Sequence, residues 1–97
     1  MKYICVKWKH LDKDEPVLLY SELDDELWER RKVEVYSDGK SDYADSQRQA
    51  GNARLSEEPL PPMEQIALDP QFEPFEISKE EFEQIWDSVY AQPSKSI

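Results

Sequence analysis

Carboxylates are the most abundant reactive side chains in this chain, and they are unevenly distributed along it. Residues 57–97 contain ten Asp and Glu residues and only two Lys, which gives this part a net charge of −8. Residues 1–56 contain twelve acids and ten bases, so the whole chain carries −10. A net charge of about 2 to 8 keeps a small domain soluble. We therefore expect one face or end of the fold to project a negative potential that attracts basic partners.

Six of these carboxylates are the candidate partner-binding residues. Three lie opposite the apolar stripe of the last predicted helix and would form a solvent-facing row, the ridge acids: Glu80, Glu83 and Asp87. A second set, the mid-chain acids, ranks behind them: Glu57, Glu58 and Glu64. A charged outer helix face usually binds nothing, so the ridge acids alone are a weak signal. The surrounding acids favour binding, because like charges repel one another and a cationic partner would relieve that repulsion.

The sequence lacks the residue sets that most catalytic or metal sites require. With one His and one Cys, it cannot assemble a zinc site of nitrogen or sulfur ligands, and the acidic turn at residues 12–15 is too short for a calcium loop. His10 and Cys5 fall on opposite faces of one predicted strand, so they do not form a base and nucleophile pair. Paired carboxylates would need environments that hold their pKa values apart, which the sequence does not indicate. We expect no enzyme activity, no cofactor and no metal.

Nucleic acid and membranes are not expected as partners either. The basic cluster Arg30, Arg31 and Lys32 lies in a predicted strand, where alternation divides it between two faces. No apolar run approaches the length of a membrane span, and the N-terminus has no signal-peptide core. The single cysteine, Cys5, agrees with a reducing compartment and is expected to fill space in a strand. These features predict a cytoplasmic protein that is a monomer or a weak dimer.

Periodicity predicts how the acids are positioned. Alternating apolar residues predict strands at 2–10, 16–23, 28–37 and 40–44, with one buried face for the first strand. The dipeptide Asp38-Gly39 favours a type I′ hairpin turn between the last two strands. A polar loop is expected at residues 45–62, because it has no apolar period.

The C-terminal half of the chain predicts helices. A short helix is expected at residues 62–69 and an extended segment at 71–77. Ser78-Lys79-Glu80-Glu81 has the form of a capping box, and an apolar stripe at helical spacing follows it: Phe82, Ile85, Trp86 and Val89. The chain is thus predicted to be a single α+β domain over residues 1–97, an antiparallel β-meander of about four strands with a short helix, a C-terminal amphipathic helix packed on one face, and a frayed tail at 92–97.

Several segments resemble a family of small, acidic, uncharacterised bacterial proteins that is classed as a domain of unknown function. They are KWKH at 7–10, DEPVLLYSELD at 14–24, RKVEVY at 31–36 with Asp38-Gly39, LSEEPLP at 55–61, DPQFE at 69–73, and ISKEEF at 77–82 with Trp86. The resemblance covers nearly the whole chain and departs at residues 46–52. The family has no established catalytic residues to transfer to this sequence.

In size and charge, such proteins are similar to the immunity proteins of bacterial toxin systems, which is an analogy of function and not of sequence. It implies an acidic immunity protein that binds and neutralises a cognate toxin domain, with a nuclease as the expected type, by covering its cationic surface. Two alternatives remain open: a nucleic-acid mimic acting on several basic proteins, and an adaptor that associates through a sheet edge.

Overall fold

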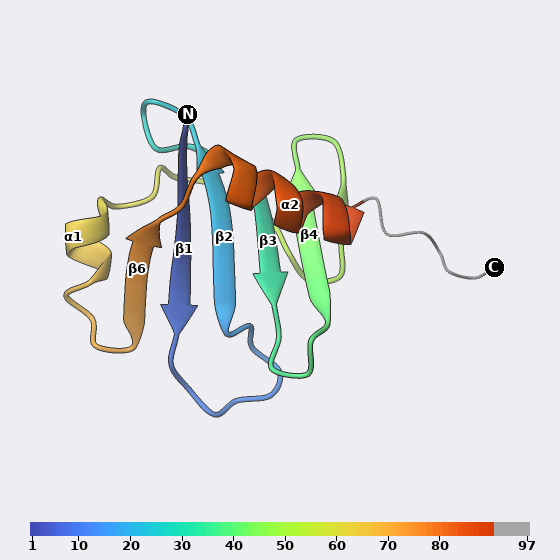
Figure 1. Cartoon of the computed structure of the whole chain (residues 1–97). Coiled ribbons are helices and arrows are strands. Elements are labelled where there is room, and N and C mark those ends of the chain that lie inside the picture. Colours follow the sequence, from blue (N-terminus) through green and yellow to red (C-terminus); the bar gives the residue numbers. More distant parts are fainter. Residues whose placement is uncertain (91–97) are drawn as a thin grey trace.

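The computed structural model describes residues 1–90, which form one antiparallel six-stranded sheet and two helices. The elements in chain order are β1 (Lys2–Trp8), β2 (Leu18–Leu23), β3 (Glu29–Val35), β4 (Ser41–Asp45), β5 (Gln49–Ala50), α1 (Met63–Ile66), β6 (Phe72–Glu76) and α2 (Lys79–Tyr90). The strands lie in the order β5-β4-β3-β2-β1-β6 (Figure 1). The predicted α+β class is confirmed, and the predicted frayed tail at 92–97 lies outside the described residues.

The strand count exceeds the predicted four, because one strand is added at each edge of the meander. β1 to β4 pair sequentially, β5 pairs with β4, and β6 pairs with β1. Pro74 has no N–H to donate to a further strand, so β6 is suited to the edge of the sheet. The alternation at residues 71–77 therefore marks an edge strand, and the predicted polar loop at 45–62 contains a short strand of its own.

The turn between β3 and β4 differs in type from the prediction. The N–H of Tyr36 donates to the carbonyl of Lys40, and the N–H of Gly39 donates to the carbonyl of Tyr36, both at 2.9 Å. Gly39 has φ of 89°, whereas Asp38 does not have a positive φ. A type I′ turn needs positive φ at both central residues, so this is a three-residue loop with Gly39 in the left-handed position.

α2 begins with the predicted capping box. The Ser78 Oγ accepts a hydrogen bond from the N–H of Glu81 at 3.0 Å, and Glu81 Oε1 accepts one from the N–H of Ser78 at 2.8 Å. Figure 1 shows α2 lying across β1 to β4. The residues buried between helix and sheet are Tyr3, Val33, Phe82 and Trp86. Neither described helix has the length and apolar composition that crossing a membrane requires.

The opposite face of the sheet carries a second core, although only one face of β1 was expected to be buried. Tyr3 and Ile4 are consecutive in β1 and therefore point to opposite faces, yet both are buried. The second core consists of Ile4, Val6 and Leu23, covered by Leu60, Met63 and Ile66. Part of the predicted polar loop is thus packed under the sheet, and Ala53 within it is fully buried.

Candidate functional site

The ridge acids do not form the solvent-facing row that the helix period predicts. Glu80 and Asp87 are exposed, and neither forms an ion pair with any residue in 1–90. Glu83 instead turns towards the sheet and binds Arg31 through both carboxylate oxygens, at 3.1 and 2.6 Å. The predicted exposure of Glu83 is wrong, because a basic residue of β3 lies within its reach.

Arg31 connects α2 to the sheet through two carboxylates. Its Nε and Nη2 each donate to Glu22 at 2.8 Å, while its other donors bind Glu83. Glu22 also accepts a hydrogen bond from the Tyr3 hydroxyl at 3.0 Å. These hydrogen bonds raise the pKa of Arg31 and lower the pKa values of Glu22 and Glu83 below their ordinary value of 4.5. Glu83 therefore has a structural partner, which the sequence could not identify because the two residues are 52 positions apart.

Aromatic rings complete this network. The guanidinium carbon of Arg31 lies 4.9 Å from the ring centroid of Phe82 and 5.0 Å from that of Trp86. A cation at this distance is attracted by the negative face of an aromatic ring. The carboxylates and rings together enclose this residue, and only 19% of the Arg31 side chain is exposed.

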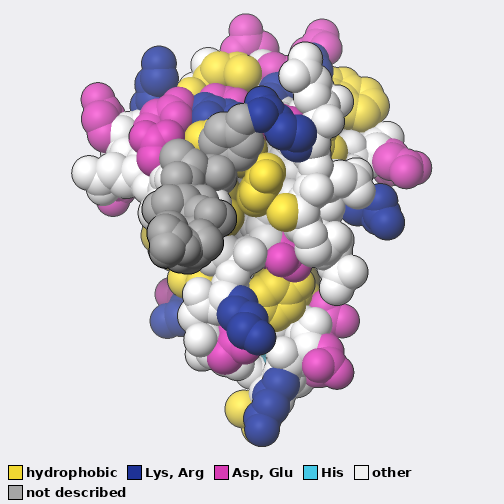
Figure 2. Space-filling model, turned by 90° about the vertical axis from the view of Figure 1, so that its right-hand side faces the viewer, with side chains coloured by type: hydrophobic (Ala, Val, Ile, Leu, Met, Phe, Trp, Pro, Cys, Tyr) yellow, Lys and Arg dark blue, Asp and Glu magenta, His cyan; other side chains and the backbone are white. Residues whose placement is uncertain are grey.

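The mid-chain acids are exposed and lie on the other side of the sheet from the ridge acids. Glu57 and Glu58 precede Leu60, and Glu64 lies in α1 between Met63 and Ile66, whose side chains pack on the second core. α2 packs on the first core. The two sets of acids are therefore not brought together into one surface. On the side of the molecule nearest β4, Lys and Arg lie among Asp and Glu, so this side is not uniformly acidic (Figure 2).

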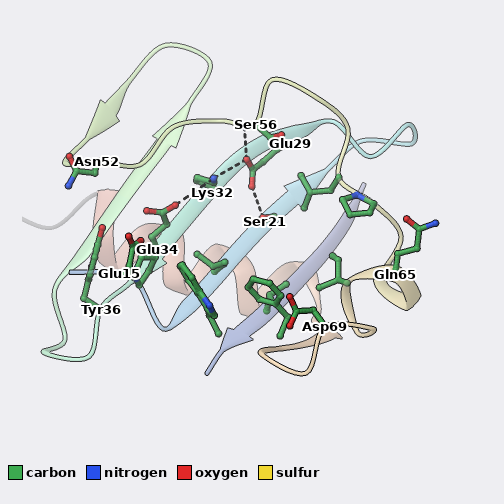
Figure 3. A pocket seen from close by; sticks show the side chains of 18 of the residues that line it. Glu15, Ser21, Glu29, Lys32, Glu34, Tyr36, Asn52, Ser56, Gln65 and Asp69 are labelled. Atoms are coloured by element: carbon green, nitrogen blue, oxygen red, sulfur yellow. Dashed lines mark hydrogen bonds and ion pairs between the residues drawn. The ribbon is translucent and has the colours of Figure 1, made fainter. Parts of the chain in front are cut away.

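A cavity of about 670 Å³ lies on the second face of the sheet, and the sequence did not predict it. One part of its wall is apolar, formed by Val6, Trp8, Leu19, Leu60, Ile66 and Phe72. Another part is polar (Figure 3), formed by Ser21, Glu29, Lys32, Glu34, Tyr36 and Ser56. The signal was present as polar residues at alternating positions in strands, but without the tertiary fold it is indistinguishable from an exposed strand face.

Glu29 holds the polar wall together. It is only 5% exposed, and it accepts hydrogen bonds from the Ser21 hydroxyl at 2.6 Å and the Ser56 N–H at 2.8 Å. Lys32 Nζ lies 3.2 Å from the same carboxylate (Figure 3). Both oxygens of Glu29 are thus occupied by groups from three segments, so this residue positions the segment around Ser56 against β2 and β3.

Glu34 is less completely paired than Glu29. Its one ion pair within residues 1–90 is with Lys32, whose Nζ lies 3.6 Å from Glu34 Oε2. Burial raises the pKa of Glu34 above its ordinary value of 4.5, and the nearby Lys32 offsets only part of that effect. Beside it, burial and a hydrogen bond donated to Asp42 raise the pKa of Tyr36 to about 12. This end of the cavity therefore has an excess of negative charge over its single lysine.

Trp8 lies in the apolar wall, and its side chain contains one polar atom, the indole nitrogen Nε1. Its ring packs edge-on against His10, with centroids 4.5 Å apart, and tilted against Phe72 at 5.7 Å. The indole Nε1–H is buried and has no acceptor among the described residues. Buried donors are nearly always satisfied, so this donor is an exception among the described residues.

Cys5 lines a shallower hollow between α2 and the β1–β6 edge. It is 2% exposed, and burial raises the pKa of its thiol, which disfavours the reactive thiolate. This environment agrees with the expected role as a space-filling residue. Among the described residues, no three His, Cys, Asp or Glu side chains come close enough together to hold a metal ion.

Comparison with known proteins identifies the family. The model of a domain of unknown function, DUF6881, matches residues 2–91, which is nearly the whole chain. The chain belongs to this family. No significant match was found among curated proteins or among solved structures.

Proposed function

We propose that this DUF6881 member is an acidic immunity protein that binds a cognate toxin domain and neutralises it by covering its cationic surface, with a nuclease as the expected type of toxin. The observation that carries the proposal is the arrangement on the second face of the sheet. There, exposed carboxylates border a cavity with apolar walls. Protein interfaces commonly have such a layout, with an apolar centre and a polar rim.

The mid-chain acids are the best candidates for the rim. Glu57, Glu58 and Glu64 are exposed and form no ion pair with any residue in 1–90. Their neighbours Ser56 and Leu60 line the cavity. A basic partner seated on this face would therefore meet negative charge at the edge and apolar surface at the centre.

The mechanism that follows is electrostatic. A net charge of −10 steers a basic protein towards the acidic chain, so association is fast at low salt. Once bound, the carboxylates occupy the positions at which a nuclease holds the phosphates of its substrate. Neutralisation then results from exclusion of nucleic acid, without chemical change in the toxin.

The first experiment is co-expression with the protein encoded beside this chain in its genome, followed by purification through a tag on this chain. A stoichiometric complex with a basic domain, together with loss of that domain's toxicity, supports the proposal. The absence of both overturns it. Binding to several unrelated basic proteins would indicate a nucleic-acid mimic, and a mass that rises with concentration would indicate an adaptor.

A pair of matched variants locates the interface. Glu57→Lys/Glu58→Lys and Glu80→Lys/Asp87→Lys change the net charge equally, but they act on opposite sides of the sheet. We expect the first variant to slow association about tenfold and the second to have a much smaller, salt-screened effect. If the Glu80→Lys/Asp87→Lys variant instead slowed association more, the partner would bind at α2.

A further inference from the structure

We propose that the cavity on the second face of the sheet is a binding site for a small organic cation with an apolar body. The site is distinct from the immunity function proposed above, because a small molecule would bind here with or without a protein partner. Two features of the cavity carry the inference: its size and the apolar and acidic side chains that line it.

The size of the cavity fits a small molecule. Its volume of about 670 Å³ lies within the range of about 300 to 1,000 Å³ that is usual for small-ligand sites. A single side chain from a protein partner would leave much of it unfilled. Its base includes the rings of Trp8 and Phe72 together with Leu19 and Ile66, so the body of the ligand should be apolar.

The charge of the cavity selects a cation. Five carboxylates and one lysine line it, and the carboxylates are Asp14, Glu15, Glu29, Glu34 and Asp69. Glu29 is occupied by protein donors, whereas Glu34 has only the long contact to Lys32. Glu15, Glu34 and Tyr36 line the same cavity, and Figure 3 shows them towards one end of it. An ammonium group at this end would be attracted by the carboxylates, while an anion would be repelled. The walls of the cavity therefore fit a ligand that is an amine or guanidine with an apolar body.

Two probes that differ in charge test this description. Phenylalaninamide has an ammonium group and an aromatic ring, whereas N-acetylphenylalaninamide has the ring without the positive charge. Titration of the full chain is followed by backbone and indole N–H chemical shifts. We expect phenylalaninamide to bind about tenfold more tightly than the uncharged probe, with saturable shifts around the cavity and at the Trp8 indole.

Variants connect the binding to the named residues. Glu34→Gln should weaken the binding of phenylalaninamide about tenfold and leave the binding of the uncharged probe unaffected. Asp87→Asn makes the same change of charge on the opposite side of the sheet and should have no effect. Equal binding of the two probes, no saturable shift, or shifts centred on α2 would each overturn the proposal. A protein that binds the probes but no toxin would separate this site from the immunity function.

Discussion

Replacement of Arg31 by methionine should destabilise the protein strongly, because it leaves a carboxylate of the interior without its counter-charge. Arg31 is 19% exposed and binds Glu22, whose side chain is 9% exposed, and Glu83, whose side chain is 34% exposed. Methionine retains much of the aliphatic contact with the rings of Phe82 and Trp86. The variant therefore tests the charge and its hydrogen bonds more than the packing.

The magnitude follows from which carboxylate can regain water. Removal of one partner of a buried ion pair costs about 3–5 kcal/mol of unfolding free energy. Glu83 is partly exposed and can be rehydrated, whereas Glu22 remains enclosed and also holds the Tyr3 hydroxyl. The cost should therefore lie near the lower limit, at about 3 kcal/mol. In a domain of this size it corresponds to a fall in Tm of roughly 12–24 °C.

The assay is urea unfolding at several pH values, with Arg30→Met as the control. Arg30 is adjacent in β3, carries the same charge and has 57% of its side chain exposed, so its replacement should have little effect.

The pKa values of Glu22 and Glu83 are lower in the folded protein than in the unfolded chain. Their contribution is therefore fully present above about pH 4.5 and is lost as the pH falls through the folded-state values. The difference between the native protein and Arg31→Met should shrink below about pH 4.5.

Two results would refute this reasoning. One is a fall in the unfolding free energy of less than about 1 kcal/mol for Arg31→Met, or a fall equal to that of Arg30→Met. Either result would mean that water already screens the charges of the network. The other concerns the double variant Arg31→Met/Glu22→Gln, in which no uncompensated charge remains beside the core. It should recover part of the lost stability, and a further loss instead would show that the buried charge is not the cause.

Three further predictions concern stability. Trp86→Ala should lower the unfolding free energy by about 3–5 kcal/mol, because this side chain is 6% exposed in the first core; an unchanged Tm would contradict that position. Ser78→Ala should cost about 1 kcal/mol and increase amide hydrogen exchange in the first turn of α2, since it removes the N-cap acceptor. Gly51→Ala should lower Tm more than Gly39→Ala: both have positive φ, but only at Gly51 would the added Cβ overlap the Asp42 carboxylate.

Elements with local causes were predictable from the sequence. The capping box at Ser78 and Glu81 joins residues three positions apart, so its hydrogen bonds could be inferred from residue types alone. The alternation of β1 likewise identified a strand. That both faces of β1 are buried could not be inferred, because the residues that cover them, at positions 60–66 and in α2, lie far along the chain.

The candidate site was predicted less well than the fold. The helical period correctly predicts that Glu80 and Asp87 are exposed. It places Glu83 on the same side of the helix, but Glu83 binds Arg31 and is only partly exposed. The cavity depends on contacts such as that between Glu29 and Ser56, which are 27 positions apart. Residue types indicate that such groups need partners, but they do not indicate which ones they find.

By itself, the sequence determined the net charge, the four strands of the meander, the last helix and its N-terminal capping box, because these depend on composition and on neighbours within a few residues. The tertiary structure alone decided that the acids divide between two sides of the sheet, that Arg31 binds Glu83, and that apolar and charged side chains enclose a cavity. These features depend on strand pairing and on the path of residues 46–71 around the sheet. Long-range pairing is a property of the whole packed chain, since each contact is made only when all the others are in place.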